Sequence, residues 1–134
     1  MNSRFIRYGV ALGCWAIASA SSLAADHTTD TLPAVKKNVE DKKAVLVDVR
    51  EQSEWNDGHV TGAVLLPLSE LHAGIDKDAL AKRLPKDQIV YTHCAVGKRS
   101  LTAADILIKA GYDVRALKAG YKDLIEAGFK KADE

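Results

Sequence analysis

Short apolar runs alternate with stretches of helical composition along most of the chain, and this alternation most limits what it can fold into. Runs at residues 44–47, 63–66 and 88–92 are short and rich in β-branched residues, and a fourth strand is expected at 113–117. Runs of this kind are typical of strands buried on both faces, as in parallel sheets. The sequence therefore predicts an α/β fold with a mostly parallel central sheet flanked by helices. The stretches expected to be helical are 31–39, 51–56, 69–84 with a break near Gly74, 99–110 and 121–127.

The first 24 residues have the composition of a secretory signal peptide. Arg4 and Arg7 give a basic start without an acid, and residues 9–20 are apolar or small but too few to span a bilayer. Small residues at Ser22 and Ala24 predict a cleaved signal peptide at 1–24. Cleavage after Ala25 and an uncleaved membrane anchor are the alternatives. In a Gram-negative cell, the exported chain is expected in the periplasm, without stable membrane association.

The remaining residues 25–134 are predicted to form one domain, because 110 residues are the size of one ordinary hydrophobic core. The loss of Arg4 and Arg7 leaves 17 basic residues against 18 acidic ones. A near-neutral surface gives no electrostatic basis for binding nucleic acid or an anionic membrane. A monomer is the default expectation for a domain this small. Residues 26–30, with the sequence DHTTD, are polar and are expected to form a loose start.

Export also removes Cys14, so that Cys94 is the one cysteine of residues 25–134. No intramolecular disulfide is then possible, and a lone cysteine in an exported protein is either a buried bystander or a thiol kept for reaction. Cys94 lies in the stretch HCAVGKRS, residues 93–100, directly after the third predicted strand and before a predicted helix. Ligands of open parallel sheets bind at this carboxyl end of the strands.

A strand, this loop and a helix in sequence would form a cradle for an anion. Gly97 permits a tight curl of the backbone, whose N–H groups and those of the first helical turn point inward. The positive end of the helix and the charges of Lys98 and Arg99 are expected to lower the pKa of Cys94. Because the thiolate is the reactive form, Cys94 is the predicted nucleophile. The predicted binding loop comprises Ala95, Val96, Gly97, Lys98 and Arg99.

The pattern Cys-x-x-Gly-x-Arg-Ser after a strand resembles the active loop of the rhodanese family of sulfurtransferases. Several further motifs resemble this family in the expected order, over about residues 44–129. The resemblance implies a single rhodanese-like domain of the small, exported subtype, without a cofactor. The closing turn reads Ala119-Gly120 where the family usually has two glycines, which is interpreted as packing variation. The further motifs are LVDVRE (46–51), EW (54–55), GHVTGA (58–63), LPL (66–68), GYDV (111–114) and LKAG (117–120).

The resemblance also implies a reaction and a set of roles. The Cys94 thiolate would take the outer sulfur of a donor such as thiosulfate and pass it, through a persulfide, to cyanide or a thiol. Lys98 is the cation expected to meet the entering anion. Arg99 is expected either to face the cradle or to lock the loop by hydrogen bonds. Asp48 and Arg50 are expected to support the loops, and a pair between Arg50 and Glu54 is the alternative without a functional role.

The histidines give no sign of a metal site. Neighbouring residues of a strand point to opposite faces, so His93 is expected to be structural and away from the Cys94 sulfur. His59 is expected to satisfy a turn beside Gly58, because no acid–base partner lies near it. Ligand spacing is absent among the four histidines of the sequence, which are His27, His59, His72 and His93.

Two other functions stay open on the sequence. A persulfide carrier needs the same cysteine and the same cradle, and it differs from an enzyme only in turnover. A phosphatase or arsenate reductase on the same fold is disfavoured, because its loop is one residue longer than the four residues found here between Cys94 and Arg99. A reductase would also normally require a second cysteine, which residues 25–134 lack.

Overall fold

A computed structural model describes residues 24–133 as an α/β domain with one four-stranded sheet. All neighbouring strands run parallel, and their order across the sheet is β2-β1-β3-β4. The prediction of a mostly parallel sheet flanked by helices is therefore confirmed. The signal-peptide prediction lies outside the described residues, except for Ala24. The strands are β1 (Ala44–Asp48), β2 (Val64–Leu65), β3 (Ile89–His93) and β4 (Asp113–Ala116).

The helices fall where the sequence predicts them, with the ends of the predicted ranges shifted by at most one residue. Thr31 caps the first helix through its hydroxyl, which accepts a hydrogen bond from the Ala34 N–H at 3.4 Å. The break expected near Gly74 separates two short helices, because Gly74 has a left-handed conformation. The helices are α1 (Leu32–Glu40), α2 (Gln52–Asp57), α3 (Leu68–Ala73), α4 (Lys77–Arg83), α5 (Lys98–Lys109) and α6 (Tyr121–Glu126).

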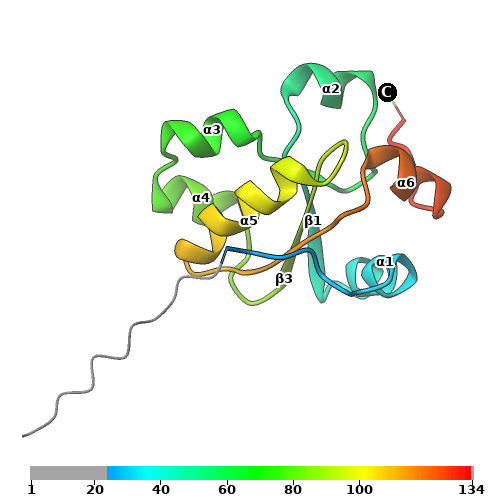
Figure 1. Cartoon of the computed structure of the whole chain (residues 1–134), viewed down its shortest axis with the longest axis horizontal. Helices are drawn as coiled ribbons and strands as arrows, with labels where there is room; N and C mark the ends of the chain where they lie inside the picture. Colours follow the sequence, from blue (N-terminus) through cyan, green and yellow to red (C-terminus); the bar gives the residue numbers. More distant parts are fainter. Residues whose placement is uncertain (1–23, 134) are drawn as a thin grey trace, which may run out of the picture.

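Two hydrophobic cores cover the two faces of the sheet. Successive strand residues alternate between them: Val47 and Val90 belong to one core, while Leu46 and Tyr91 belong to the other. Helices α3, α4 and α5 supply side chains to the first core, and α1 and α6 supply side chains to the second (Figure 1). The sheet is thus sandwiched between two layers of helices, which cover its faces and not the ends of its strands.

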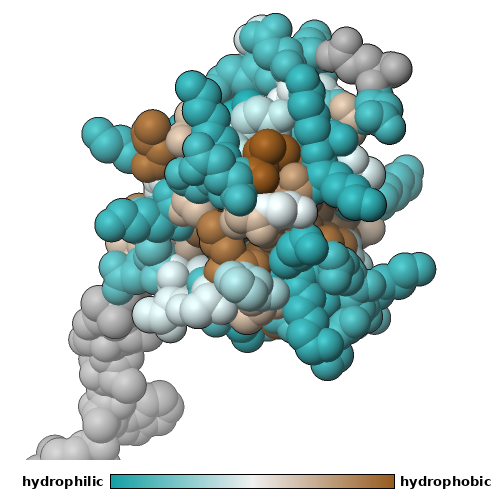
Figure 2. All heavy atoms as spheres, turned by 90° about the vertical axis from the view of Figure 1, so that its right-hand side faces the viewer, coloured by the Kyte–Doolittle hydropathy of each residue, from teal (hydrophilic) through white to brown (hydrophobic). Residues whose placement is uncertain are grey.

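The surface carries little exposed apolar area on the face that bears α1 and α6. Figure 2 shows this face as mostly hydrophilic side chains with small apolar areas between them. Among residues 24–133, the large apolar side chains classed as exposed are Val96, at 73%, and Ile108, at 45%. No helix in this part of the chain is both long and apolar enough to cross a membrane.

The expectation that residues 26–30 form a loose start is wrong. These residues form an arm along β4, seen in Figure 1 as the blue segment beside the orange strand. His27 makes a parallel bridge with Ala116, and the Thr28 N–H donates to the Ala116 carbonyl at 2.8 Å. The physical reason is that β4 lies at the edge of the sheet, where its outer backbone groups lack a partner strand. The arm supplies part of that pairing.

Candidate active site

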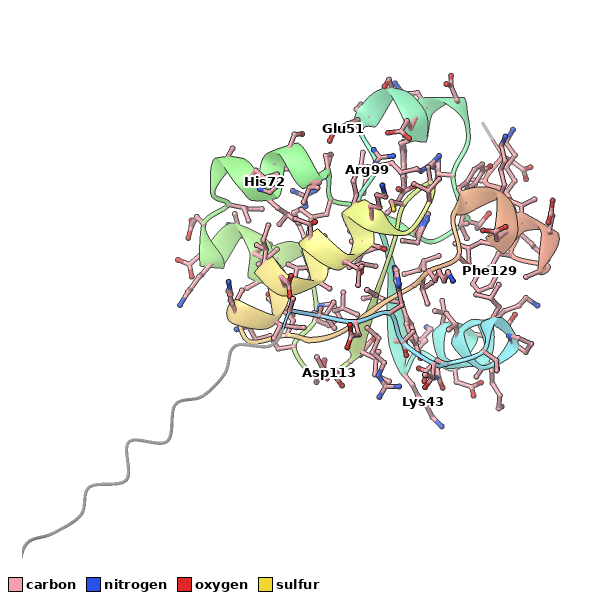
Figure 3. All side chains as sticks on the ribbon, in the orientation of Figure 1. Lys43, Glu51, His72, Arg99, Asp113 and Phe129 are labelled. Carbon is pink, nitrogen blue, oxygen red and sulfur yellow. The ribbon has the colours of Figure 1, made fainter. Side chains whose placement is uncertain are left out.

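The site lies at the carboxyl end of the sheet, where β3 ends and α5 begins. Figure 3 shows Glu51 and Arg99 at this end of the molecule, and Lys43 and Asp113, which lie at strand starts, at the other. Cys94 directly follows β3, and the loop from Ala95 to Gly97 leads into the helix. The chain thus brings the predicted nucleophile to the edge where parallel sheets bind ligands.

Backbone N–H groups surround the Cys94 sulfur. The Gly97 N–H donates to Cys94 Sγ at 3.1 Å. Burial raises the pKa of Cys94, but hydrogen bonds from the N–H groups of Ser100, Val96 and Gly97 outweigh it. The pKa of Cys94 is therefore held below its ordinary value of 9.0. This environment favours the thiolate, which is the nucleophilic form.

Gly97 occupies a place that only glycine fits. Its φ of +87° lies in the left-handed region, and it caps the start of α5. A Cβ atom at this position would lie 2.8 Å from the Lys118 carbonyl oxygen and 3.1 Å from His27 Nε2. The loop is consequently packed between the segment after β4 and the N-terminal arm.

Gly120 supports the same loop from the closing turn. A Cβ atom here would lie 1.8 Å from the Ala95 carbonyl oxygen, which is impossible without moving the backbone. The following N–H, that of Tyr121, donates to the Cys94 carbonyl at 2.9 Å. The turn therefore keeps a glycine at the position that touches the loop, while the departure from the family pattern falls on Ala119.

Ser100 fixes the first turn of α5 to the end of the sheet. Its hydroxyl lies 2.9 Å from the Gly97 carbonyl and 2.8 Å from the Leu117 carbonyl. One hydroxyl donates one hydrogen, so the two carbonyls share it. The Ser100 carbonyl in turn accepts from the Thr92 hydroxyl at 2.9 Å. Sequence reasoning missed this role, although the serine of the Arg-Ser motif was the available signal.

Arg99 locks the loop onto α2. Its two terminal nitrogens lie 2.6 and 2.9 Å from the two carboxylate oxygens of Glu54. This bidentate pair lowers the pKa of Glu54 to about 2 and raises that of Arg99. Of the two roles that the sequence left open for Arg99, the geometry matches the locking one. The alternative pair between Glu54 and Arg50 is wrong, because Glu54 pairs with Arg99 and Arg50 pairs with Asp48.

Asp48 and Arg50 form a buried ion pair at the carboxyl end of β1. The Arg50 side chain binds the Asp48 carboxylate through Nε, at 3.0 Å, and through a terminal nitrogen, at 2.7 Å. The same nitrogen donates to the Gly58 carbonyl at 2.8 Å, and the guanidinium lies 4.4 Å from the centre of the Tyr121 ring. Arg50 thus joins the ends of β1 and α2 to α6, which suits a supporting role.

Neither His93 nor His59 is bonded to the sulfur in the described part of the chain. His93 is fully buried, and its Nδ1 lies 3.4 Å from the Cys94 carbonyl oxygen. Its Nε2 has no hydrogen-bond partner and lies 3.7 Å from Asp48. Burial lowers the pKa of His93, so the ring is neutral there. His59 stacks on Trp55 and bonds to the Trp55 carbonyl at 3.1 Å, within the turn where the sequence places it.

A pocket of about 320 Å³ opens beside the loop. Two of its lining residues, Tyr121 and Lys122, were missed because they follow the closing turn far along the sequence. Lys98, the cation that the sequence predicts to meet the anion, is exposed and does not line this pocket. The lysine that lines the pocket is Lys122. Cys94 has no exposed surface and lies behind the loop. The lining residues are Arg50, Glu54, Ala95, Val96, Tyr121 and Lys122.

Metal binding has no support in this arrangement. Residues 24–133 contain no group of three or more histidine, cysteine, aspartate or glutamate side chains placed to hold a metal ion. The site itself presents the Cys94 sulfur beside an N–H donor, with the Glu54–Arg99 and Asp48–Arg50 ion pairs nearby.

Comparison with known protein families matches residues 31–127 to the rhodanese-like domain. The chain belongs to the rhodanese-like family. The matched residues include the cysteine loop, both ion pairs and the closing turn. The predicted resemblance is therefore confirmed, and the stretch from Cys94 to Arg99 lies within the matched residues.

Sulfurtransferases are among the similar proteins. The thiosulfate sulfurtransferase PspE of Escherichia coli is 33% identical over 79 residues, which cover 58% of this chain and 71% of PspE. A probable adenylyltransferase/sulfurtransferase, MoeZ of Mycobacterium tuberculosis, is 34% identical over 100 residues, or 74% of this chain but only 24% of MoeZ. The structure of a human single-domain sulfurtransferase superposes with a TM-score of 0.63 at 25% identity, covering 78% of this chain and 96% of that one. These rhodanese-family relatives support sulfur transfer in general.

Proposed function

We propose that this protein is a thiosulfate-type sulfurtransferase that carries sulfur as a persulfide on Cys94. The observation that carries the proposal is the Cys94 sulfur itself, held 3.1 Å from the Gly97 N–H with its pKa lowered by loop N–H groups. The loop counts six residues from Cys94 to Arg99, which favours sulfur transfer over phosphate chemistry.

The first step loads the enzyme. The Cys94 thiolate attacks the outer sulfur of thiosulfate, and a new S–S bond forms as the original sulfur–sulfur bond breaks. The electron pair of the broken bond leaves with sulfite. The outer sulfur remains on Cys94 as a persulfide anion, stabilised by the N–H donors that serve the thiolate. No proton, metal or redox cofactor is needed for this exchange.

The second step unloads the enzyme. A nucleophilic acceptor, which is cyanide or a thiolate, attacks the outer sulfur of the persulfide. The bond between the two sulfurs breaks, and its electron pair returns to Cys94 as the thiolate. The product is thiocyanate from cyanide, or a new persulfide from a thiol. The cycle then restarts, so one Cys94 serves many turnovers.

The pocket beside the loop is the proposed entrance for both substrates. It is large enough, at about 320 Å³, for thiosulfate or a small thiol, and Lys122 gives it a cationic wall. Arg50 and Arg99 are each neutralised by a carboxylate, which leaves the lysine to attract an anion. Because Cys94 is covered, the donor reaches it only when the loop side of the pocket, formed by Ala95 and Val96, moves aside.

The covered sulfur also favours a second candidate function, that of a persulfide carrier. A persulfide in this position would be shielded from solvent until a partner opens the loop. The carrier would load once with donor and release sulfur only to that partner. Single loading without turnover is the behaviour that separates this candidate from the enzyme.

The proposed location is the periplasm, reached through cleavage of a signal peptide at residues 1–24. Support comes from the basic start, the short apolar stretch and the small residues at Ser22 and Ala24. Intact mass of the protein recovered from cells tests this directly. A chain starting at Ala25 is expected, and a chain that retains residue 1 would overturn the proposal.

The decisive experiment measures thiocyanate formation from thiosulfate and cyanide by the wild-type chain and by Cys94→Ser. Multiple turnovers that the serine variant loses would support the enzyme. One added sulfur on Cys94 by mass, without turnover, would support the carrier instead. The absence of both turnover and loading would overturn both proposals. A phosphate ester assay would then test the disfavoured phosphatase function.

A further inference from the structure

We propose that His27, in the N-terminal arm, positions the catalytic loop by holding the Gly97 carbonyl. The proposal adds a positioning residue to the sulfurtransferase proposed above, and it rests on that function for its catalytic consequence. His27 does not touch the sulfur. Its effect is transmitted through the peptide between Gly97 and Lys98.

The arm is tied down on both sides of His27. At its start, the Ala25 N–H donates to Asp105 of α5 at 2.6 Å. At its end, Asp30 accepts from the Tyr91 hydroxyl at 2.6 Å and pairs with Arg115 at 2.7 Å. Anchors at both ends limit the motion of the imidazole between them. His27 is therefore held against the loop rather than swinging freely in solvent.

The contact with the loop is short and direct. His27 Nε2 lies 2.7 Å from the Gly97 carbonyl oxygen, which has no hydrogen to give, so the imidazole is the donor. The carbonyl and N–H of one trans peptide point in opposite directions. By holding the Gly97 carbonyl towards the arm, His27 therefore directs the Lys98 N–H away from it. The orientation of this peptide sets the direction of the Lys98 N–H, the first N–H group of α5, relative to the loop.

The contact with His27 also affects the N–H group that donates a hydrogen bond to the Cys94 sulfur. Gly97 carries both groups: its N–H bonds to Cys94 Sγ and its carbonyl is held by His27. Only the φ and ψ angles of Gly97 separate the two peptides, and glycine resists rotation about them least of all residues. An external hydrogen bond is thus the means by which a permissive residue is kept at φ +87°. Ser100 provides the second such bond, from inside the helix.

The arm lies outside the residues that match the family. The rhodanese-like match covers residues 31–127, so the whole arm lies before it. The segment after β4 already packs closely against Gly97, because the Lys118 carbonyl oxygen lies 2.8 Å from where a Cβ of residue 97 would be. His27 lies close to the same position, at 3.1 Å. The arm and the segment after β4 therefore both pack against the loop at Gly97.

The test compares His27→Leu, which removes the donor but keeps similar bulk, with His27→Gln, which restores an N–H donor at similar reach. His72→Leu is the matched control, because His72 is exposed on α3. Each variant is measured by the rate of Cys94 alkylation with iodoacetamide across pH, and by kcat and KM for thiosulfate. Urea unfolding of each variant shows whether it folds.

For His27→Leu we expect Cys94 alkylation near neutral pH to fall by about threefold to tenfold, the range of one hydrogen bond. Each rate is taken relative to the same variant's high-pH plateau, so that a change in access to the covered sulfur cancels. The midpoint of its pH profile should rise, and kcat should fall with little change in KM. His27→Gln should recover most of the rate. An alkylation profile of His27→Leu equal to wild type would overturn the proposal, as would a glutamine variant as slow as the leucine one. Alkylation requires no sulfur donor, so this result is independent of whether thiosulfate is the substrate.

Discussion

At the scale of single residues, the lowered pKa of Cys94 has only part of the origin expected from the sequence, which named the helix end together with two side-chain charges. The expectation gave Lys98 and Arg99 a part in lowering its pKa. The structure instead attributes the lowering mainly to backbone N–H groups of the loop and helix. Arg99 is paired with Glu54, and Lys98 is exposed to solvent, where water screens its charge. The N–H donors set by the loop shape are thus the larger influence on the sulfur, and the charge of Arg99 is a smaller one.

Two substitutions separate loop shape from charge. Lys98→Gln should leave the pH midpoint of Cys94 alkylation within experimental error of wild type. Ser100→Ala removes a hydroxyl that holds the carbonyl of Gly97, whose N–H donates to the sulfur, so the alkylation midpoint of Cys94 should rise towards 9.0. Its alkylation at neutral pH should slow by about threefold. Thr102→Ala is the control, because Thr102 carries an exposed hydroxyl on the same helix. A large shift in the lysine variant with none in the serine variant would contradict this explanation.

The Glu54–Arg99 pair predicts a pH dependence of stability. The pKa of Glu54 falls from 4.5 to about 2 on folding, so its stabilising contribution is complete above 4.5 and is lost as pH drops towards 2. Both side chains are about one third exposed, at 31% and 34%, so solvent reduces the effect. Glu54→Gln should therefore lower the unfolding free energy modestly at neutral pH. Urea titrations should show the difference from wild type vanishing as pH falls through this window.

Enzymatic activity is the second property to measure in the Glu54→Gln variant. Glu54→Gln should lower kcat/KM several-fold because the loop loses its link to α2. Glu70→Gln is the matched control, since Glu70 forms a comparably exposed pair with Arg83 away from the loop. It should change stability by a similar amount and leave activity unchanged. Equal activity in both variants would show that the Arg99 link does not position the loop.

At the scale of elements, the sequence predicts what depends on local pattern. Apolar runs and caps predict the sheet and helices, because burial on two faces requires such runs. Pairings between distant segments leave no local pattern: Glu54 and Arg99 lie 45 residues apart. For this reason the choice between Arg99 and Arg50 as the partner of Glu54 was beyond the sequence. Cys94 itself was found because its strand, loop and helix are contiguous.

The closing turn supplies a test at this scale. Gly120→Ala places a methyl group 1.8 Å from the Ala95 carbonyl, so the loop must shift. We expect a loss of about 1 to 3 kcal/mol in unfolding free energy, as for overpacked sites, together with a much larger fractional loss of kcat. Gly62→Ala is the control, because its surroundings are open and its φ of +78° imposes only local strain. Similar stability losses with activity kept in both variants would contradict a role of the turn in shaping the loop.

At the scale of the whole molecule, the N-terminal arm joins the proposed processing site to the catalytic loop. From composition alone, residues 26–30 were predicted to be loose, because their side chains are polar and show no periodicity. Their partners are backbone groups of an edge strand and of the loop, which only the assembled sheet presents. Where the chain is cut therefore bears on how the arm is anchored, because Ala25 contacts Asp105 through its nitrogen.

Cleavage after Ala24 would convert this contact into an ion pair. The Ala25 nitrogen, 2.6 Å from the Asp105 carboxylate, is a peptide N–H in the uncut chain and an ammonium group in the processed one. Asp105→Asn should therefore destabilise the processed chain by about 1 kcal/mol more than the uncut chain, because a charged hydrogen bond is stronger than a neutral one. Urea midpoints of the four proteins, with each N-terminus verified by mass, provide the measurement. Equal effects of the substitution in both forms would show that the new amino group does not anchor the arm.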